Sequence, residues 1–236
     1  MTLDLIRATV VERIELTDRL LIIKLRTREE FSFVPGEYCT FVIGGIERDY
    51  SIASAPHEGF LEFFIEKVPG GRVTPQLWDK KIGDTVELRP KAQGTLLLDA
   101  AYPNQLMIAT VTGIAPFISM LRSYIHTGSG SHRFYILHGA SYHNEFGYKD
   151  EIERLSRKYT NIVYIPTVSR PQDEKNKGWH GEFGRVNLIV EKYIERFSLE
   201  PANTIVYACG HPEMIRDVKK RLGNKGYKLR EEKYWE

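Results

Sequence analysis

Three short segments of this chain combine residue types that could act together in redox chemistry. They read Arg48-Asp49-Tyr50-Ser51, Thr112-Gly113-Ile114-Ala115-Pro116-Phe117 and Cys209-Gly210-His211-Pro212. The first offers a cation, a flat ring and a hydroxyl, the second a glycine turn ahead of a helix, and the third a thiol beside a glycine. Each segment alone is a weak signal. In this order they are what an electron-transfer protein using a flavin and a nicotinamide would need.

The first segment meets three requirements of a flavin dinucleotide site. A flavin needs a flat apolar face for its ring, a hydrogen bond near its N5 atom and donors for its pyrophosphate. Side chains alternate along a strand, so Arg48 and Tyr50 share a face and Ser51 opposes them unless the strand bends. A barrel strand with a surface arginine and a half-buried tyrosine would have the same residues, so the segment alone leaves both interpretations open.

A second anion-binding element follows about twenty residues later. Residues 70–74 read Gly-Gly-Arg-Val-Thr and precede a predicted helix over 74–79, with Thr74 as N-cap and Pro75 next. Glycine lets a backbone approach phosphate closely, and a helix N-terminus favours an anion. Arg72 adds charge and Thr74 a hydroxyl. The alternative is an ordinary hairpin loop with a helix cap.

The second and third segments each join a predicted strand to a predicted helix. The strand 106–109 runs through Thr110 and Val111 into the glycine turn, and Cys209 closes the last strand of the chain's second half. Dinucleotide phosphates bind at such strand-to-helix turns in doubly wound sheets. The alternative for Cys209 is a small buried residue at a strand end, which is the usual place of a cysteine. Its position at the carboxyl edge of the sheet favours the functional interpretation.

Two halves with different periodicity must position these segments. The first half has short alternating runs at 10–14, 20–25, 38–43, 50–53, 61–65 and 85–88, separated by turn signals, which predicts a six-stranded antiparallel β-barrel. In the second half, apolar runs at 106–109, 134–138, 162–168 and 204–208 alternate with helical patterns at 116–126, 149–158, 186–197 and 212–225. That alternation predicts an α/β domain, with a parallel sheet of five strands. The predicted domains are 1–101 and 102–236.

Composition excludes several other classes of function. The net charge is only +2 and no basic block interleaves with aromatics, so nucleic-acid binding is not expected. No apolar run approaches the ~20 residues that span a bilayer, and no signal peptide is recognised, so a cytoplasmic location is expected. The two cysteines are too few for an iron–sulfur cluster, and the seven histidines have no metal-ligand spacing. No nucleophile–base pair is evident, and the oligomeric state is not indicated.

The three segments together resemble the ferredoxin–NADP(+) reductase superfamily, most closely its short bacterial members, over residues 10–235. The resemblance implies that Arg48 contacts the pyrophosphate of FAD, Tyr50 stacks on the flavin and Ser51 reaches N5. It also implies that Cys209 lies beside the reacting rings. Tightly held FAD is implied too, since reductases that only borrow free flavin generally lack the second phosphate element. The further FAD-binding residues implied are Glu66, Lys67, Val68, Gly71, Arg72, Val73, Thr74 and Trp235.

The same resemblance extends to the nicotinamide nucleotide. Relatives usually read Gly-Thr-Gly where this chain has Val111, so how the nucleotide lies over this turn stays open. Arg170 and Arg185 favour NADP over NAD, because a 2′-phosphate needs cations, although Ser141 stands where some relatives have arginine. The alternative for either arginine is a solvated loop charge. The residues implied are Thr110, Thr112, Gly113, Ser141, Ser169, Arg170, Arg185, Cys209 and Gly210. The terminal pair Tyr234 and Trp235 would pack on FAD or simply anchor the tail.

The implied function is hydride transfer between NADP(H) and flavin N5, with single electrons passing to or from a ferredoxin or flavodoxin (EC 1.18.1.-). A basic rim of Lys67, Arg72, Lys80 and Lys81 would suit an acidic partner. One alternative is an NAD(P)H:flavin or quinone reductase without a protein acceptor. Another is a non-catalytic reductase-like subunit that docks in a larger complex.

Overall fold

The computed structural model describes residues 5–128 and 130–233, so Tyr234 and Trp235 lie outside the described residues. The chain forms two compact units, which we describe separately. The first contains Met1–Leu97 and Ala115–Gly128, and the second contains Leu98–Ile114 and Ser129–Glu236.

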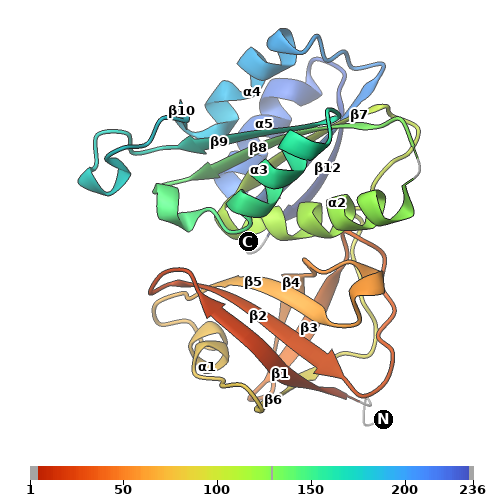
Figure 1. Ribbon diagram of the computed structural model, residues 1–236, viewed down its shortest axis with the longest axis vertical. Helices are drawn as coiled ribbons and strands as arrows, with labels where there is room; N and C mark the ends of the chain where they lie inside the picture. Colours follow the sequence, from red (N-terminus) through yellow and green to blue (C-terminus); the bar gives the residue numbers. More distant parts are fainter. Residues whose placement is uncertain (1–4, 129, 234–236) are drawn as a thin grey trace. The chain divides into compact units, whose positions relative to one another are not determined.

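The first unit is built on an antiparallel sheet of six strands (Figure 1). The strands are β1 (Ile6–Glu15), β2 (Leu20–Thr27), β3 (Tyr38–Ile43), β4 (Ile46–Ser51), β5 (Leu61–Glu66) and β6 (Thr85–Leu88). They lie in the order β4-β3-β6-β1-β2-β5. The edge strands β4 and β5 also contact each other, so the sheet closes into a nearly complete barrel. Alternate side chains, such as those of Leu21, Ile23 and Leu25, fill its core. The predicted six-stranded barrel is confirmed.

The fourth strand starts earlier than predicted. The prediction over 50–53 is wrong, because β4 runs from Ile46 to Ser51. Gly44 and Gly45 both have positive φ and form a two-residue turn, so pairing with β3 resumes at Ile46. The strand therefore ends at Ser51, and the predicted site residues Arg48, Tyr50 and Ser51 lie near its end and not at its start.

Three helical segments belong to the first unit: η1 (Pro56–Glu58), α1 (Thr74–Trp78) and α2 (Ala115–Thr127). Helix α2 is bound to the barrel by polar contacts. Ser119 Oγ donates to the Ser54 carbonyl at 2.6 Å, and Arg122 Nη1 donates to Glu62 Oε1 at 2.9 Å. The Glu62 side chain is only 4% exposed, so this ion pair is largely withdrawn from water.

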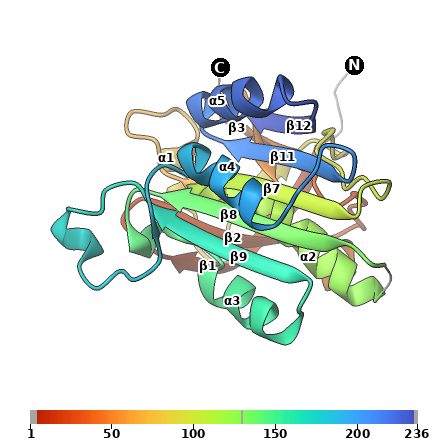
Figure 2. The ribbon, with the colours of Figure 1, turned by 90° about the horizontal axis from the view of Figure 1, so that it is seen from above.

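The second unit contains a parallel sheet of six strands in the order β10-β9-β8-β7-β11-β12 (Figure 2). The strands are β7 (Asn104–Thr110), β8 (Arg133–Ala140), β9 (Ile162–Val168), β10 (Glu182–Phe183), β11 (Thr204–Gly210) and β12 (Lys228–Lys233). The α/β class is confirmed, but the predicted count of five is wrong. Neither edge strand could be predicted from the pattern of apolar residues, because β10 has only two residues and β12 reads Lys-Leu-Arg-Glu-Glu-Lys. Charges of this kind protect an edge from further pairing.

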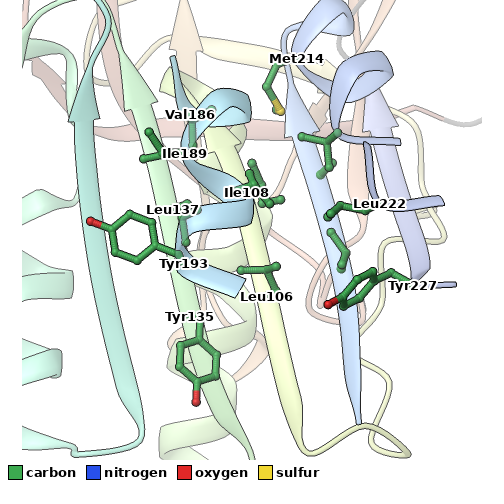
Figure 3. Close-up of a cluster of buried hydrophobic side chains, with 14 of the residues drawn as sticks. Leu106, Ile108, Tyr135, Leu137, Val186, Ile189, Tyr193, Met214, Leu222 and Tyr227 are labelled. Atoms are coloured by element: carbon green, nitrogen blue, oxygen red, sulfur yellow. The ribbon is translucent and has the colours of Figure 1, made fainter. Parts of the chain in front are cut away.

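Helices cover both faces of this sheet. They are α3 (Lys149–Lys158), α4 (Val186–Arg196) and α5 (Pro212–Gly223), and three short segments, η2 (Val111–Ile114), η3 (His143–Glu145) and η4 (Glu174–Asn176), join the elements. Figure 3 shows Leu106 and Ile108 of β7 and Leu137 of β8 packed against side chains of α4 and α5. Helix α3 packs on β9, with its Ile152 fully buried. The predicted helices agree with the structure to within two residues at each end.

Candidate functional site

The end of strand β4 brings Arg48, Tyr50 and Ser51 to the barrel's edge. Cys39 pairs with Tyr50 and Phe41 pairs with Arg48, so Arg48 and Tyr50 share the face that carries the core residues of β3. The Tyr50 ring lies 4.9 Å from the Phe41 ring and is half-buried. Ser51, the last residue of the strand, is buried.

At the end of β4, a neutral phenol lies near an exposed guanidinium. Burial raises the pKa of the Tyr50 phenol well above its ordinary value, so Tyr50 stays neutral at physiological pH. The Arg48 guanidinium is exposed, and its Nη1 donates to the Glu47 carbonyl at 2.6 Å. A neutral ring and an exposed cation therefore lie two residues apart on one face, as a flat cofactor with a phosphate tail requires.

The loop between β5 and α1 is a compact turn that only glycine permits. Val68 N–H donates to Thr74 Oγ1 at 2.9 Å, and Gly71 N–H donates to the Val68 carbonyl at 2.9 Å. A Cβ on Gly71 would lie 2.9 Å from that carbonyl oxygen and 3.1 Å from Thr74 Oγ1. Thr74 is the first residue of α1 and Val73 is the N-cap, while the Thr74 hydroxyl accepts from Val68 N–H. The predicted N-cap is therefore wrong.

The other predicted residues of this loop already have partners. Glu66 Oε1 accepts from Arg19 Nη2 at 2.9 Å, and Lys67 Nζ lies 5.1 Å from the centre of the Trp78 ring. Lys67 N–H donates to the Arg19 carbonyl at 2.7 Å. Because the N–H groups of Lys67 and Val68 are both engaged, these two residues could contact a ligand only through other atoms. Val73 is buried, whereas Arg72 is exposed.

In the second unit, the turns after β7 and β11 meet at the carboxyl edge of the sheet. The chain runs outward from β7 to β10 on one side and returns to β11 and β12 on the other, so β7 and β11 flank the topological switch point. Thr110 Oγ1 accepts from His211 N–H at 2.8 Å. A Cβ on Gly210 would lie 2.2 Å from Thr110 Oγ1, and one on Gly113 would lie 2.2 Å from the Cys209 carbonyl oxygen. Both glycines are thus required where the backbones touch.

Val111, the departure noted in the sequence, adopts a left-handed conformation with φ of 43°. A β-branched residue in this region is strained by about 1–3 kcal/mol. Its carbonyl oxygen accepts from His138 Nε2 at 2.9 Å, and Val111 packs against the buried cluster of Ala140, Phe146 and Val168. The structure therefore keeps a glycine-like turn despite the valine. Thr112, next in the chain, is buried.

The loops after β8 and β9 are joined by a residue that the sequence did not single out. Asn176 is 4% exposed, and its Nδ2 donates to the carbonyls of Ser141 and Arg170, each at 2.9 Å. Its Oδ1 accepts from His143 N–H at 2.8 Å. Ser169 N–H donates to the Ala140 carbonyl at 2.9 Å. A buried amide inside a polar loop gives no sequence signal, since polar loop residues are ordinarily exposed.

This arrangement gathers two cations on one tyrosine. Arg170 Nη1 donates to Tyr142 Oη at 2.8 Å, and Lys175 Nζ lies 4.6 Å from the centre of the Tyr142 ring. Tyr142 follows the predicted Ser141 directly, whereas Lys175 was not predicted as a site residue. Arg185 is exposed and stands immediately before α4. An aromatic face with two cations beside it can bind a planar base that carries a phosphate.

Other kinds of site were sought in residues 5–128 and 130–233. In that part of the chain, no three side chains of His, Cys, Asp or Glu are grouped to hold a metal ion. No helix there combines the length and the apolar character needed to cross a membrane.

Comparison with known proteins identifies the family. The family model described as "Oxidoreductase FAD-binding domain" matches residues 7–95, and the one described as "Oxidoreductase NAD-binding domain" matches residues 107–220. Ferredoxin--NADP reductase A of Sorangium cellulosum is 30% identical over 238 residues, which is 93% of this chain and 83% of that protein. The chain belongs to the ferredoxin–NADP reductase family of oxidoreductases. FAD and a nicotinamide dinucleotide are the cofactors for which its two domains are named.

The chain is also similar to a second curated protein and to a solved structure. The toluate 1,2-dioxygenase electron transfer component of Pseudomonas putida is 29% identical over 210 residues, but these span 87% of this chain and only 59% of that protein. A ferredoxin NADP+ reductase from Neisseria gonorrhoeae, solved with bound FAD and NADP, has the same fold. Its TM-score is 0.85 at 24% identity, covering 97% of this chain and 98% of that one.

Proposed function

We propose that this chain transfers hydride between NADP(H) and FAD and exchanges single electrons with a ferredoxin- or flavodoxin-type protein, as an enzyme of class EC 1.18.1. The main supporting observation is that each unit has a turn where only glycine fits. In the first unit it is at Gly71, and in the second it is at Gly113, beside the Cys209 carbonyl. Bound FAD would supply the chemistry, since it accepts two electrons together and releases them singly. The chain's residues would bind, orient and shield the reacting groups in a cytoplasmic enzyme.

Three residues of β4 would hold the flavin. The exposed Arg48 would bind pyrophosphate, and the neutral Tyr50 ring would stack on the flavin. Ser51 would hydrogen-bond to N5, the atom that gains or loses hydride. In the β5–α1 loop, Arg72 would bind phosphate, with the Thr74 hydroxyl as a further donor, while Gly71 would let the backbone approach the phosphate closely. Trp235 stays a predicted contact outside the described residues.

The preference for NADP rests on the two cations at Tyr142. Arg170 and Lys175 would neutralise a 2′-phosphate while the tyrosine ring supports the adenine, with Ser141, Ser169 and Arg185 nearby in the chain. NAD lacks this phosphate and would gain nothing from either cation. Thr110, Thr112, Gly113 and Gly210 would contact the remainder of the nucleotide, and the fully buried Cys209 would orient the nicotinamide.

A protein acceptor is supported by the names of two relatives. One is an electron transfer component of a dioxygenase and another is a ferredoxin reductase. Lys67, Arg72, Lys80 and Lys81 lie on or around α1 and would form the basic rim for an acidic partner. Reversing these charges should weaken association at low salt; unchanged binding would remove the rim from the proposal.

An absorbance spectrum after gel filtration, followed by anaerobic titration, tests this function. A flavin spectrum that survives filtration and is bleached preferentially by NADPH over NADH would support it, as would turnover with ferredoxin. Loosely held flavin with turnover on free flavin or quinone alone would favour the reductase without a protein acceptor. A protein that retains no FAD and oxidises neither nucleotide would favour the non-catalytic subunit.

A further inference from the structure

The turn after β7 holds a residue that does not favour its own backbone conformation. Within residues 5–128 and 130–233, three non-glycine residues have positive φ, namely Val111, Tyr148 and Ser198, and Val111 alone is β-branched. A conformation of this kind persists only where its surroundings impose it. Val111 opens η2, and the next residue, Thr112, is one of the predicted nucleotide contacts.

The group that holds this conformation is a buried histidine. His138 of β8 is fully buried, and its Nε2 lies 2.9 Å from the Val111 carbonyl oxygen. Its Nδ1 lies 3.0 Å from Tyr164 Oη of β9. Burial lowers the pKa of His138 to about 4, so the ring is neutral at physiological pH.

These contacts fix which nitrogen carries the proton. A carbonyl oxygen can only accept, so Nε2 must be the protonated nitrogen and the donor to Val111. Nδ1 is then an acceptor, and the Tyr164 hydroxyl donates to it. The Phe146 ring packs edge-on against the imidazole, with 5.0 Å between the ring centres, and belongs to the buried cluster against which Val111 packs. Tyr164, His138 and Val111 therefore form one directed chain of two hydrogen bonds.

The bond from His138 sets the orientation of a whole peptide group. The Val111 carbonyl and the Thr112 N–H belong to one planar trans peptide and point in opposite directions. Fixing the carbonyl on His138 therefore fixes the N–H on the opposite side of that peptide. We propose that His138 is a positioning residue for the nicotinamide nucleotide, holding the Val111–Thr112 peptide in the orientation that the nucleotide requires. This inference rests on the proposed function.

The test compares the affinity of the FAD-loaded protein for NADP+ among variants, by calorimetry. His138→Phe keeps a ring and removes the donor, and should raise the Kd about tenfold, the effect of about one net hydrogen bond. His138→Gln restores an N–H and should stay within about threefold of wild type. His132→Phe is the matched control, because His132 also contacts a backbone carbonyl, that of Ala100 at 3.2 Å, and should leave the Kd unchanged.

A second arm uses the strain at Val111. Glycine adopts a left-handed conformation without strain, so in a Val111→Gly background His138→Phe should raise the Kd by less than about threefold. Equal effects of His138→Phe in both backgrounds would overturn the inference. So would a Kd unaffected by His138→Phe, or a His138→Gln variant as weak as His138→Phe.

Two results separate this inference from the proposed function. A wild-type protein that binds neither NADP+ nor NAD+ would overturn both, whereas normal binding insensitive to His138 would overturn only the inference. If His138→Phe does not fold, the ¹⁵N resonances of the wild-type ring decide. A neutral ring protonated on Nε2 at pH 7 supports the positioning role, and a proton on Nδ1 overturns it.

Discussion

A Cβ atom on Gly113 would lie 2.2 Å from the carbonyl oxygen of Cys209, so the two strand-to-helix turns of the second unit touch through their backbones. Gly113→Ala should therefore destabilise this unit by roughly 1–3 kcal/mol and weaken nucleotide binding, because backbone cannot yield as a side chain can. Gly223→Ala is the matched control, since a Cβ there meets nothing within 4 Å. Thermal unfolding of both variants measures the difference, and equal melting temperatures would contradict the close approach.

Ser51→Ala tests the proposed contact with flavin N5. The variant should retain FAD while its hydride step slows by about tenfold or more, as expected when an orienting hydrogen bond is lost. Rapid-mixing reduction by NADPH measures that step. Ser54→Ala is the comparison, because Ser54 Oγ accepts from Glu62 N–H at 3.1 Å and should affect stability in place of the hydride rate. An unimpaired hydride step in Ser51→Ala would remove the N5 role.

Arg170→Ala and Lys175→Ala test the nucleotide preference. Each should raise the KM for NADPH by roughly tenfold, since hydrogen bonds to charged groups contribute about 1.5–3 kcal/mol, and should leave the KM for NADH unchanged. Arg157→Ala, an exposed arginine of α3, controls for a general loss of positive charge. Parallel changes for both nucleotides would assign these cations to some other contact.

The buried His138 predicts how stability depends on pH. Its native pKa of about 4 lies below its ordinary value of 6.5, so between these values the unfolded chain binds a proton that the folded chain does not. The neutral His138 ring therefore contributes fully to the free energy of unfolding above pH 6.5, and this contribution is lost as the pH falls to about 4. Melting temperatures across that window should fall less steeply in His138→Gln than in wild type. Identical slopes would mean that His138 does not titrate as described.

The ion pair between Arg122 and Glu62 predicts a large effect on the first unit. Arg122→Met would leave a carboxylate that is 4% exposed without its closest cation, and should destabilise this unit by about 3–5 kcal/mol. The double variant with Glu62→Gln should recover much of this loss, because no buried charge remains. Lys177→Ala removes an exposed pair with Glu174 and should change stability by less than about 1 kcal/mol. A similar loss in both single variants would contradict the assignment.

Much of this fold could be predicted from sequence because its signals are local. The apolar run Leu20-Leu21-Ile22-Ile23 marks strand β2, and Pro212 marks the start of α5. The strand Lys228–Lys233 could not be predicted, because five of its six residues are charged and only pairing with β11 makes it a strand.

The residues of the candidate site also differ in how far the sequence could predict them. Arg48, Tyr50 and Ser51 are adjacent in sequence, so one strand suffices to predict that they act together. Asn176 and His138 act through partners on other elements, Ser141 and Val111, which only tertiary structure brings near. Val111 itself was visible as a departure, but its left-handed backbone and its buried donor were not.

Because α2 belongs to the barrel unit while the strand before it belongs to the other, the peptide passes from one unit to the other three times. A single protease cut near residue 98 would therefore detach the barrel strands but leave α2 of the same unit covalently joined to the second unit through residues 114–115. A fragment ending at residue 101 would lack the helix whose Arg122 neutralises Glu62. Complete covalent separation of the two units requires three cuts. A split-reporter or domain-exchange design must therefore include residues 115–128 with the barrel.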